Sequence, residues 1–149
     1  MATATVFRSY VKARNEGNAV NFTTATLLLV LLTDAAIGNL NDAANGAGSD
    51  FLSDLTAYEV TGTNYARKTL SGVTPGMSSG VYTVGASDPT AYAQSGAGFT
   101  NARFAVLVAD GANDAARRLI QYWDLGANVG NVAGPLTLDL DTNELLSDA

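Results

Sequence analysis

The chain has 149 residues, of which 47% are hydrophobic and 15% are charged, and its net charge is −6. The length fits one ordinary domain, and the apolar fraction is that of a globular chain rather than a disordered one. There is no cysteine and no histidine, which excludes disulfides and the common Ser-His and Cys-His nucleophiles and leaves zinc without its two favoured ligands. We therefore expect no cofactor, and stability that comes from packing or oligomerisation.

Nucleic acid and membrane are both poor partners for this composition. The eight basic residues are scattered, with their densest group at the N-terminus, whereas nucleic-acid binding normally needs a basic patch. The longest apolar run, residues 27–32, is far shorter than the roughly 20 residues of a membrane helix. Residues 1–17 lack the apolar stretch of a secretory signal. We expect neither a nucleic-acid partner nor a membrane partner.

The first elements in chain order are an N-terminal segment and a long strand. Residues 1–14 permit a strand, a short helix or an arm that becomes ordered on a neighbour, and the early threonines favour extended chain. We treat 1–14 as an N-terminal arm or edge strand and 15–149 as the main domain. Residues 21–33 predict a strand whose second half is buried on both faces. A buried helix is the alternative there, because Leu and Ala also favour helix.

The next segment predicts a loop, a short helix and a strand pair. Residues 34–50 are rich in Asn, Asp, Gly and Ala, which is typical of a loop. Ser49 or Asp50 can cap a helix of one or two turns over residues 51–55. Residues 57–61 and 65–70 then predict two short strands joined by a Thr-Gly-Thr-Asn turn, in which glycine and asparagine tolerate positive φ.

The rest of the chain continues as short strands separated by turn-rich loops. We expect strands at 81–84, 99–109, 117–125 and 136–140, and loops at 71–80, 86–98 and 126–134. Seven or eight short strands with little helix predict an all-β fold. The expected architecture is a single antiparallel β-sandwich, jelly-roll-like, with long loops and at most one or two short helices.

Two sets of residues could be catalytic, but each is also explained by an ordinary role at the protein surface. Lys68 lies three residues before Ser71, but a Ser-Lys pair needs a buried lysine with a depressed pKa. Paired carboxylates suit glycoside hydrolysis. The candidates are Asp50, Asp54 and Glu59, and Asp110, Asp114 and Asp124. Solvated loop acids and helix caps explain these carboxylates more simply. We expect no catalytic residues.

The segment that begins at Asp139 resembles the opening of a calcium loop, with Asp141 and Asn143 at alternate positions. Glu144 stands where the loop needs glycine, and the chelating twelfth position falls beyond Ala149. This is therefore not an EF-hand loop. A simpler site of loop acids and carbonyls stays open as a hypothesis, and no metal ligands are assigned.

Protein contact is the function that the composition favours. Few charges and a large apolar supply suit a protein with extensive contacts, and tyrosine often anchors interfaces. Edge strands of a small sandwich also invite pairing with a neighbouring chain. The expected partner-binding residues are N-terminal cations and tyrosines, namely Arg8, Tyr10, Lys12, Arg14, Tyr58 and Tyr65.

The order of these segments resembles a family of small β-rich virion proteins of tailed bacteriophages. The likeness is carried by residues 51–70 (FLSDLTAYEVTGTNYARKTL) and extends from about residue 20 to about residue 145. It includes four further segments, at residues 26–33, 103–106, 119–126 and 136–140. No single motif within it is chemically diagnostic, and the ordered series carries the resemblance.

The resemblance implies a non-enzymatic structural protein of the virion, made in the host cytoplasm. The leading hypothesis is a capsid decoration (cement) protein that binds the outer surface of the major capsid lattice and stabilises the head. It would act as a homodimer or homotrimer. The N-terminal arm would be ordered by the lattice, where its cations suit an acidic shell. The alternative is a tail component, either a tail-tube, terminator or fibre-associated subunit, with residues 34–50 as a ring-stacking loop. A third hypothesis is a carbohydrate-binding or glycan-cleaving adhesin.

Overall fold

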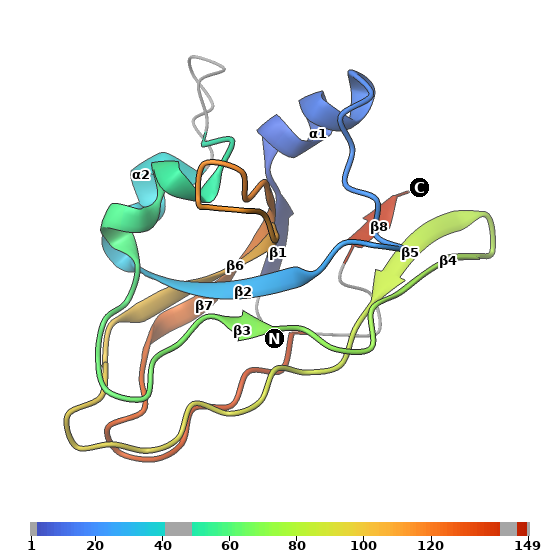
Figure 1. The fold of residues 1–149 in the computed structure, drawn as a ribbon. Helices are drawn as coiled ribbons and strands as arrows, with labels where there is room; N and C mark the ends of the chain where they lie inside the picture. Colours follow the sequence, from blue (N-terminus) through green and yellow to red (C-terminus); the bar gives the residue numbers. More distant parts are fainter. Residues whose placement is uncertain (1–2, 41–48, 141–145, 149) are drawn as a thin grey trace.

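The structure is a computed structural model that describes residues 3–40, 49–140 and 146–148. It confirms the all-β class, because antiparallel strands form two sheets and the helices are short (Figure 1). The larger sheet has the order β1-β7-β6-β2-β3 and the smaller one the order β4-β5-β8. The jelly-roll-like sandwich stays a prediction. Among the described residues, no helix has the length and hydrophobicity needed to cross a membrane.

The core lies at the centre of the larger sheet. It is built from β2 (Leu27–Thr33), β6 (Ala102–Ala109) and β7 (Leu119–Val129). β2 is buried along its apolar run because both faces of the sheet are covered, as its sequence predicted. Helical segments cover one face, and long connections run across the other (Figure 1). The three central strands therefore hold the scaffold to which the loops attach.

The N-terminal segment is both strand and helix, in succession. β1 (Thr3–Val6) pairs with β7 at the edge of the sheet, and α1 (Arg8–Asn15) follows directly. Phe7 joins the two elements and is buried, and its backbone N–H donates to the carbonyl of Ile120 at 3.0 Å. The segment is thus anchored to the domain in this structure.

Residues 34–40 correct the predicted loop. A 3₁₀ turn, η1 (Asp34–Ala36), runs directly into α2 (Ile37–Leu40). Ala36 and Leu40 are buried, so packing on the sheet stabilises helix in a segment whose composition favours loop. Residues 41–48 of the same predicted loop, which was also the proposed ring-stacking loop, lie outside the described residues.

The predicted helix at 51–55 is present as 3₁₀ turns, and the strand expected at 57–61 is wrong. The turns are η2 (Leu52–Asp54) and η3 (Thr56–Tyr58). The Asp54 carboxylate accepts the backbone N–H groups of Asp50 and Phe51 at 3.0 and 3.1 Å, which stabilises the first turn. Only an isolated bridge between Glu59 and Leu32 remains of the expected strand.

The strand expected at 65–70 is shorter than predicted. It is reduced to β3 (Lys68–Thr69), which pairs with β2. The turn before it is present, with Asn64 at φ 64° and the Tyr65 N–H donating to the Gly62 carbonyl at 3.1 Å. The residues between this turn and β3 are instead held by side-chain contacts, which are described below.

The smaller sheet corrects a second predicted loop. β4 (Thr74–Ser78) pairs with β5 (Val81–Gly85), and β5 pairs with β8 (Leu146–Asp148). The two residues between β4 and β5, Ser79 and Gly80, both have positive φ, as a tight two-residue hairpin turn requires. The Pro75-Gly76 pair predicted a turn, but proline is tolerated in β4 because β4 is an edge strand.

The last strands also differ from expectation. β7 continues through Gly126 to Val129, where a loop was predicted. The strand expected at 136–140 is absent, and an isolated bridge between Tyr92 and Leu136 stands in its place. Leu138 and Leu140 are nevertheless buried, as the alternation predicted. The strand at residues 21–33 begins only at Leu27, because residues 21–25 form a turn.

Candidate functional site

The predicted N-terminal cations lie on α1. Arg8 and Lys12 are exposed and Arg14 is half-buried. Lys12 approaches Glu16 at 3.9 Å, a contact between two exposed side chains that is worth little. Tyr10 is a correction, because only 1% of it is exposed and its ring packs edge-on against Phe22. Helical spacing explains this, since α1 turns Tyr10 toward the core while the cations stay outside.

The two other predicted tyrosines form hydrogen bonds with residues outside α1. Tyr58 accepts a 2.8 Å hydrogen bond from the side-chain amide of Asn39. The Tyr65 hydroxyl donates to Glu59 Oε1 at 2.8 Å and accepts the Leu31 N–H at 3.2 Å. Burial and the neighbouring Glu59 raise the pKa of Tyr65. Both tyrosine hydroxyls are therefore bonded within the domain.

The Tyr65 hydroxyl belongs to a network of ion pairs around Arg67. Arg67 binds Glu59 through two nitrogens, at 2.6 and 2.8 Å, and Asp114 through two more contacts, at 2.6 and 3.0 Å. Asp114 also accepts from Arg117, which in turn binds Asp110. We call these five charged residues, Glu59, Arg67, Asp110, Asp114 and Arg117, the Arg67 cluster. It joins the segment before β3 to the loop between β6 and β7.

The Arg67 cluster contains three of the carboxylates that the sequence offered for catalysis. Hydrogen bonds from Arg67 and Arg117 lower the pKa of Asp114 to about 2, and Arg117 lowers the pKa of Asp110. A carboxylate held this way stays ionised and is a poor proton donor, whereas a general acid needs a raised pKa. The geometry suits fastening of two loops better than proton transfer.

The other residues considered for catalysis or metal binding are the Lys68–Ser71 pair and the carboxylates. Lys68 lies over the ring of Tyr92 and donates to Thr90 and Ala91, and none of these bonds reaches Ser71. No group of three or more metal-binding side chains occurs among the residues that the structure describes. The calcium-like segment is not tested by this, since Asp141, Asn143 and Glu144 lie outside the described residues.

Three loops on the same side of the sheet meet at Asn131, which is completely buried. Its side-chain oxygen accepts the Phe99 N–H at 2.9 Å, and its amide donates to the carbonyls of Thr63 and Ala93 at 3.1 and 2.8 Å. Gly130 is required beside it, because a Cβ there would overlap the Phe99 carbonyl. The sequence predicted only loops here and gave no sign of their connection.

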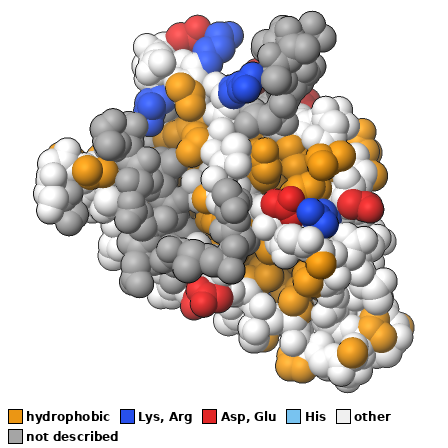
Figure 2. Space-filling view, turned by 180° about the vertical axis from the view of Figure 1, so that it is seen from behind, with side chains coloured by type: hydrophobic (Ala, Val, Ile, Leu, Met, Phe, Trp, Pro, Cys, Tyr) orange, Lys and Arg blue, Asp and Glu red, His pale blue; other side chains and the backbone are white. Residues whose placement is uncertain are grey.

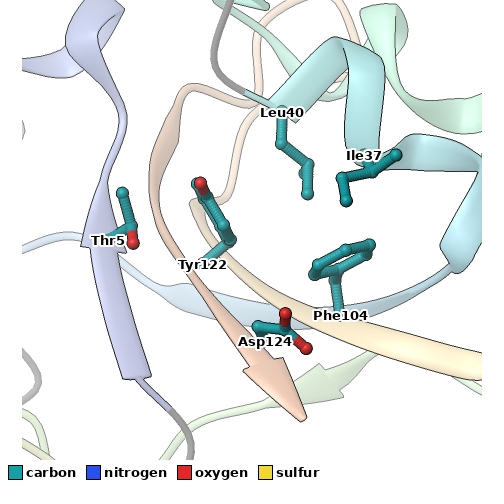
Figure 3. Close-up of a pocket in the computed structure, with 6 residues that line it drawn as sticks. All are labelled: Thr5, Ile37, Leu40, Phe104, Tyr122 and Asp124. Carbon is teal, nitrogen blue, oxygen red and sulfur yellow. The ribbon is translucent and has the colours of Figure 1, made fainter. Parts of the chain in front are cut away.

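A pocket that sequence reasoning missed lies between α2 and the sheet, with a volume of about 290 Å³. We call it the α2 pocket. Its lining comes from four elements whose side chains converge in Figure 3, namely Thr5, Ile37, Leu40, Phe104, Tyr122 and Asp124. The alternation of β6 and β7 placed Phe104 and Tyr122 on one sheet face, but only the position of α2 makes that face a pocket.

Charged side chains border the α2 pocket. Arg103 binds Asp124 through two contacts, at 2.7 and 3.0 Å. Asp34, at the start of η1, is exposed and lies close enough to add to the raised pKa of Arg103, after the larger effect of Asp124. Figure 2 shows a hydrophobic area next to an acidic, a basic and a second acidic side chain, with Lys and Arg side chains gathered over α1 on the same face.

No protein family, curated protein or solved structure that was compared with the chain matches it. The residues and their geometry are therefore the basis for a function.

Proposed function

We propose that the chain is a non-enzymatic virion structural protein that decorates the capsid of a tailed bacteriophage. It binds the outer surface of the major capsid lattice and stabilises the assembled head. The resemblance of residues 51–70 and the segments around them supports this proposal, as does the sparse charge of the surface. The ion-paired carboxylates of the Arg67 cluster support a contact function over a catalytic one.

The β4–β5 hairpin is the observation that carries the lattice contact. It extends away from the larger sheet (Figure 1), and residues 74–85 contain no charged side chain. Met77 on β4 is 69% exposed, which is costly for a large apolar side chain that stays in water. Exposed methionines are favoured where a surface adapts to a partner. An uncharged projecting hairpin suits burial against another protein.

The edge of the hairpin also indicates the kind of contact. Ser78 and Val81 flank a two-residue turn and so form a hydrogen-bonded pair, which makes Pro75 and Val84 a non-bonded pair. The missing N–H of Pro75 therefore falls on the outer edge of β4, where it blocks strand addition. The hairpin is built to bind through side chains, with Met77 at the centre.

Stabilisation of the head follows from mass action. A protein that binds only the assembled lattice shifts the equilibrium away from disassembly by an amount set by its concentration relative to its Kd. A shell offers many equivalent sites, so even a weak contact protects the whole particle when the subunit is multivalent.

Binding to capsids that lack the protein tests the proposal. We expect co-sedimentation with expanded capsids, repeating density on the outer shell in electron cryomicroscopy, and a gain in thermal resistance of the particle. Met77→Asp is expected to weaken binding at least tenfold, which corresponds to about 1.4 kcal/mol, since it places a charge in the contact. Met77→Leu keeps the apolar volume and should bind like the parent.

Absence of the protein from the shell, with density along the tail instead, would overturn the decoration function and favour a tail component. Equal binding of Met77→Asp and the parent would show that Met77 and the hairpin around it do not take part in the contact. Both variants change an exposed side chain, so circular dichroism is expected to show the parent fold for each.

A further inference from the structure

The α2 pocket has an apolar wall beside two polar side chains, Thr5 and Asp124. Its walls carry the aromatic rings of Phe104 and Tyr122 and the aliphatic side chain of Leu40 (Figure 3). Ile37 stands at its border and is 69% exposed. A large aliphatic side chain left in water beside an apolar hollow marks a contact surface.

The border of the α2 pocket is acidic. Asp34 and Asp124 contribute two negative charges and Arg103 one positive charge, so the three groups sum to −1. The Arg103 guanidinium donates two hydrogen bonds to Asp124, at 2.7 and 3.0 Å. Asp34 is exposed and precedes Ile37 by three residues in a continuous helical segment, which places both side chains on one face. The occupant should therefore carry an apolar group next to a cation.

The exposed face of α1 carries that combination. The large hydrophobic side chains that are exposed in the described part of the chain are Val11, Ile37 and Met77. Met77 lies in the uncharged hairpin and offers no cation. Val11 is 36% exposed. Lys12 projects about 100° further around the helix, and its long side chain is 73% exposed, with a contact of 3.9 Å to Glu16. Charge complementarity thus selects α1 over the hairpin.

Both surfaces lie on the same side of the molecule. Thr5 of β1 lines the α2 pocket, and the Phe7 ring, just before α1, packs at 5.2 Å from the ring of Tyr122 in the pocket wall. Figure 2 shows the cations over α1 and the bordered hydrophobic area on one face. Two complementary surfaces on one face are what a two-fold axis requires, because each copy offers one surface to the partner and receives the other.

We infer that the chain forms a two-fold homodimer in which Val11 of each copy enters the α2 pocket of the other and Lys12 pairs with Asp34 across the interface. The inference does not depend on the capsid function, since it rests on this face alone. Because the charges are paired, the dimer should weaken as salt rises.

A charge exchange tests the dimer without any capsid present. Sedimentation equilibrium of the full chain is expected to show a mass that rises from one to two chains with concentration. Lys12→Glu places a second carboxylate against Asp34 at both contacts, and Asp34→Lys places a second ammonium group against Lys12 at both. Each variant alone should dimerise at least roughly tenfold more weakly than the parent.

An equal mixture of the two variants gives the decisive result. In the mixed dimer, one contact joins the carboxylate introduced by Lys12→Glu to the ammonium group introduced by Asp34→Lys. The other contact joins the unchanged Lys12 of one copy to the unchanged Asp34 of the other, so both contacts are attractive. We expect the mixture to regain the parent's dimer affinity. Asp88→Lys, a charge reversal on an exposed residue that belongs neither to α1 nor to the pocket lining, should leave dimerisation unchanged.

The inference would be overturned by a parent chain that stays monomeric at all concentrations, or by a mixture no stronger than either variant alone. A mass of three chains would exclude the two-fold arrangement. The exchange changes exposed side chains only. Thermal unfolding is therefore expected to show each variant folded, with at most a small fall in Tm from the new like-charge neighbours Glu16 and Arg103, which rules out misfolding as the cause.

Discussion

Two sides of the molecule use charged and polar side chains in opposite ways. Around Arg67 and Asn131, they bond to the protein itself and hold four loops against the sheet. On the face formed by α1 and α2, Lys12 and Asp34 point into water, and Val11 and Ile37 are exposed beside them. We call these the fastened side and the open face.

This difference indicates that the fastened side contributes to stability and that the open face is available for recognition. Bonds on the fastened side fix loops whose composition alone would leave them without a single conformation. On the open face, Lys12 and Asp34 add little to folding because both are exposed, and they stay available for contact. Substitutions on the fastened side should therefore lower stability, and those on the open face should change association.

Asn131 is expected to give the largest effect. Asn131→Ala removes three hydrogen bonds and leaves the buried Phe99 N–H without an acceptor. We expect the free energy of unfolding to fall by about 3 kcal/mol, because each lost bond counts roughly 1 kcal/mol and an unsatisfied buried donor costs more. Urea unfolding followed by the fluorescence of the single tryptophan, the buried Trp123, measures it.

The matched variant on the open face is Ile37→Ser. Ile37 is mostly exposed, so its replacement should change the free energy of unfolding by no more than about 0.5 kcal/mol. Equal losses for Asn131→Ala and Ile37→Ser would abolish the distinction between the two sides.

Arg67 gives the next largest effect. Arg67→Met removes the cation that holds Glu59 and Asp114, whose side chains are only 15% and 28% exposed. We expect a loss of about 2 kcal/mol, because the two carboxylates are left partly buried, with Glu59 stripped of its ion pair. Differential scanning calorimetry measures the loss and should show a lower Tm.

Arg103→Met is the control for this effect, since Arg103 binds a single carboxylate through two contacts and lies on the open face. Its ion pair with Asp124 is more exposed, at 29% and 39%, so its loss should lower the Tm less than the loss of the Arg67 contacts does. If Arg103→Met cost as much as Arg67→Met, the Arg67 cluster would be no more than ordinary surface pairing.

The central strands could be predicted from sequence because burial leaves a direct mark on it. Residues 27–32 are apolar throughout, and the continuous run predicts a strand covered on both faces, as β2 is. The β4 strand could not be predicted in the same way. Pro75 and Gly76 are local turn signals, and only the position of β4 at a sheet edge makes proline harmless there.

The candidate sites could be predicted less well than the strands. Arg67 and Asp114 are 47 residues apart, and nothing in either segment selects the other as its partner. The α2 pocket draws on four elements, one of which, α2, was expected to be loop. Arg8 and Lys12 were predicted as contact residues from charge density alone, but Tyr10 between them faces the core because the segment is helical.

Lowering the pH should reduce the stability contributed by the fastened side, by a smaller amount than the substitutions above. The pKa of Asp114 is about 2 in the folded protein, mainly because of hydrogen bonds from Arg67, against an ordinary value of 3.8. A lowered folded pKa means that Asp114 contributes its full stabilisation above about pH 4 and loses it as the pH falls toward 2. Because the side chain is 28% exposed, we expect about 1 kcal/mol rather than the full value of the shift.

Urea unfolding between about pH 5 and pH 2 measures this dependence. The parent's free energy of unfolding should fall across the interval, and Asp114→Asn, which has no carboxylate at this position, should show a shallower fall. Arg67→Met should be shallower too, since it removes the main cause of the lowered pKa. Asp110 and Asp124, whose pKa values are also lowered, leave part of the slope in both variants. A parent and an Asp114→Asn variant with the same slope would show that Asp114 is not held by the Arg67 cluster in solution.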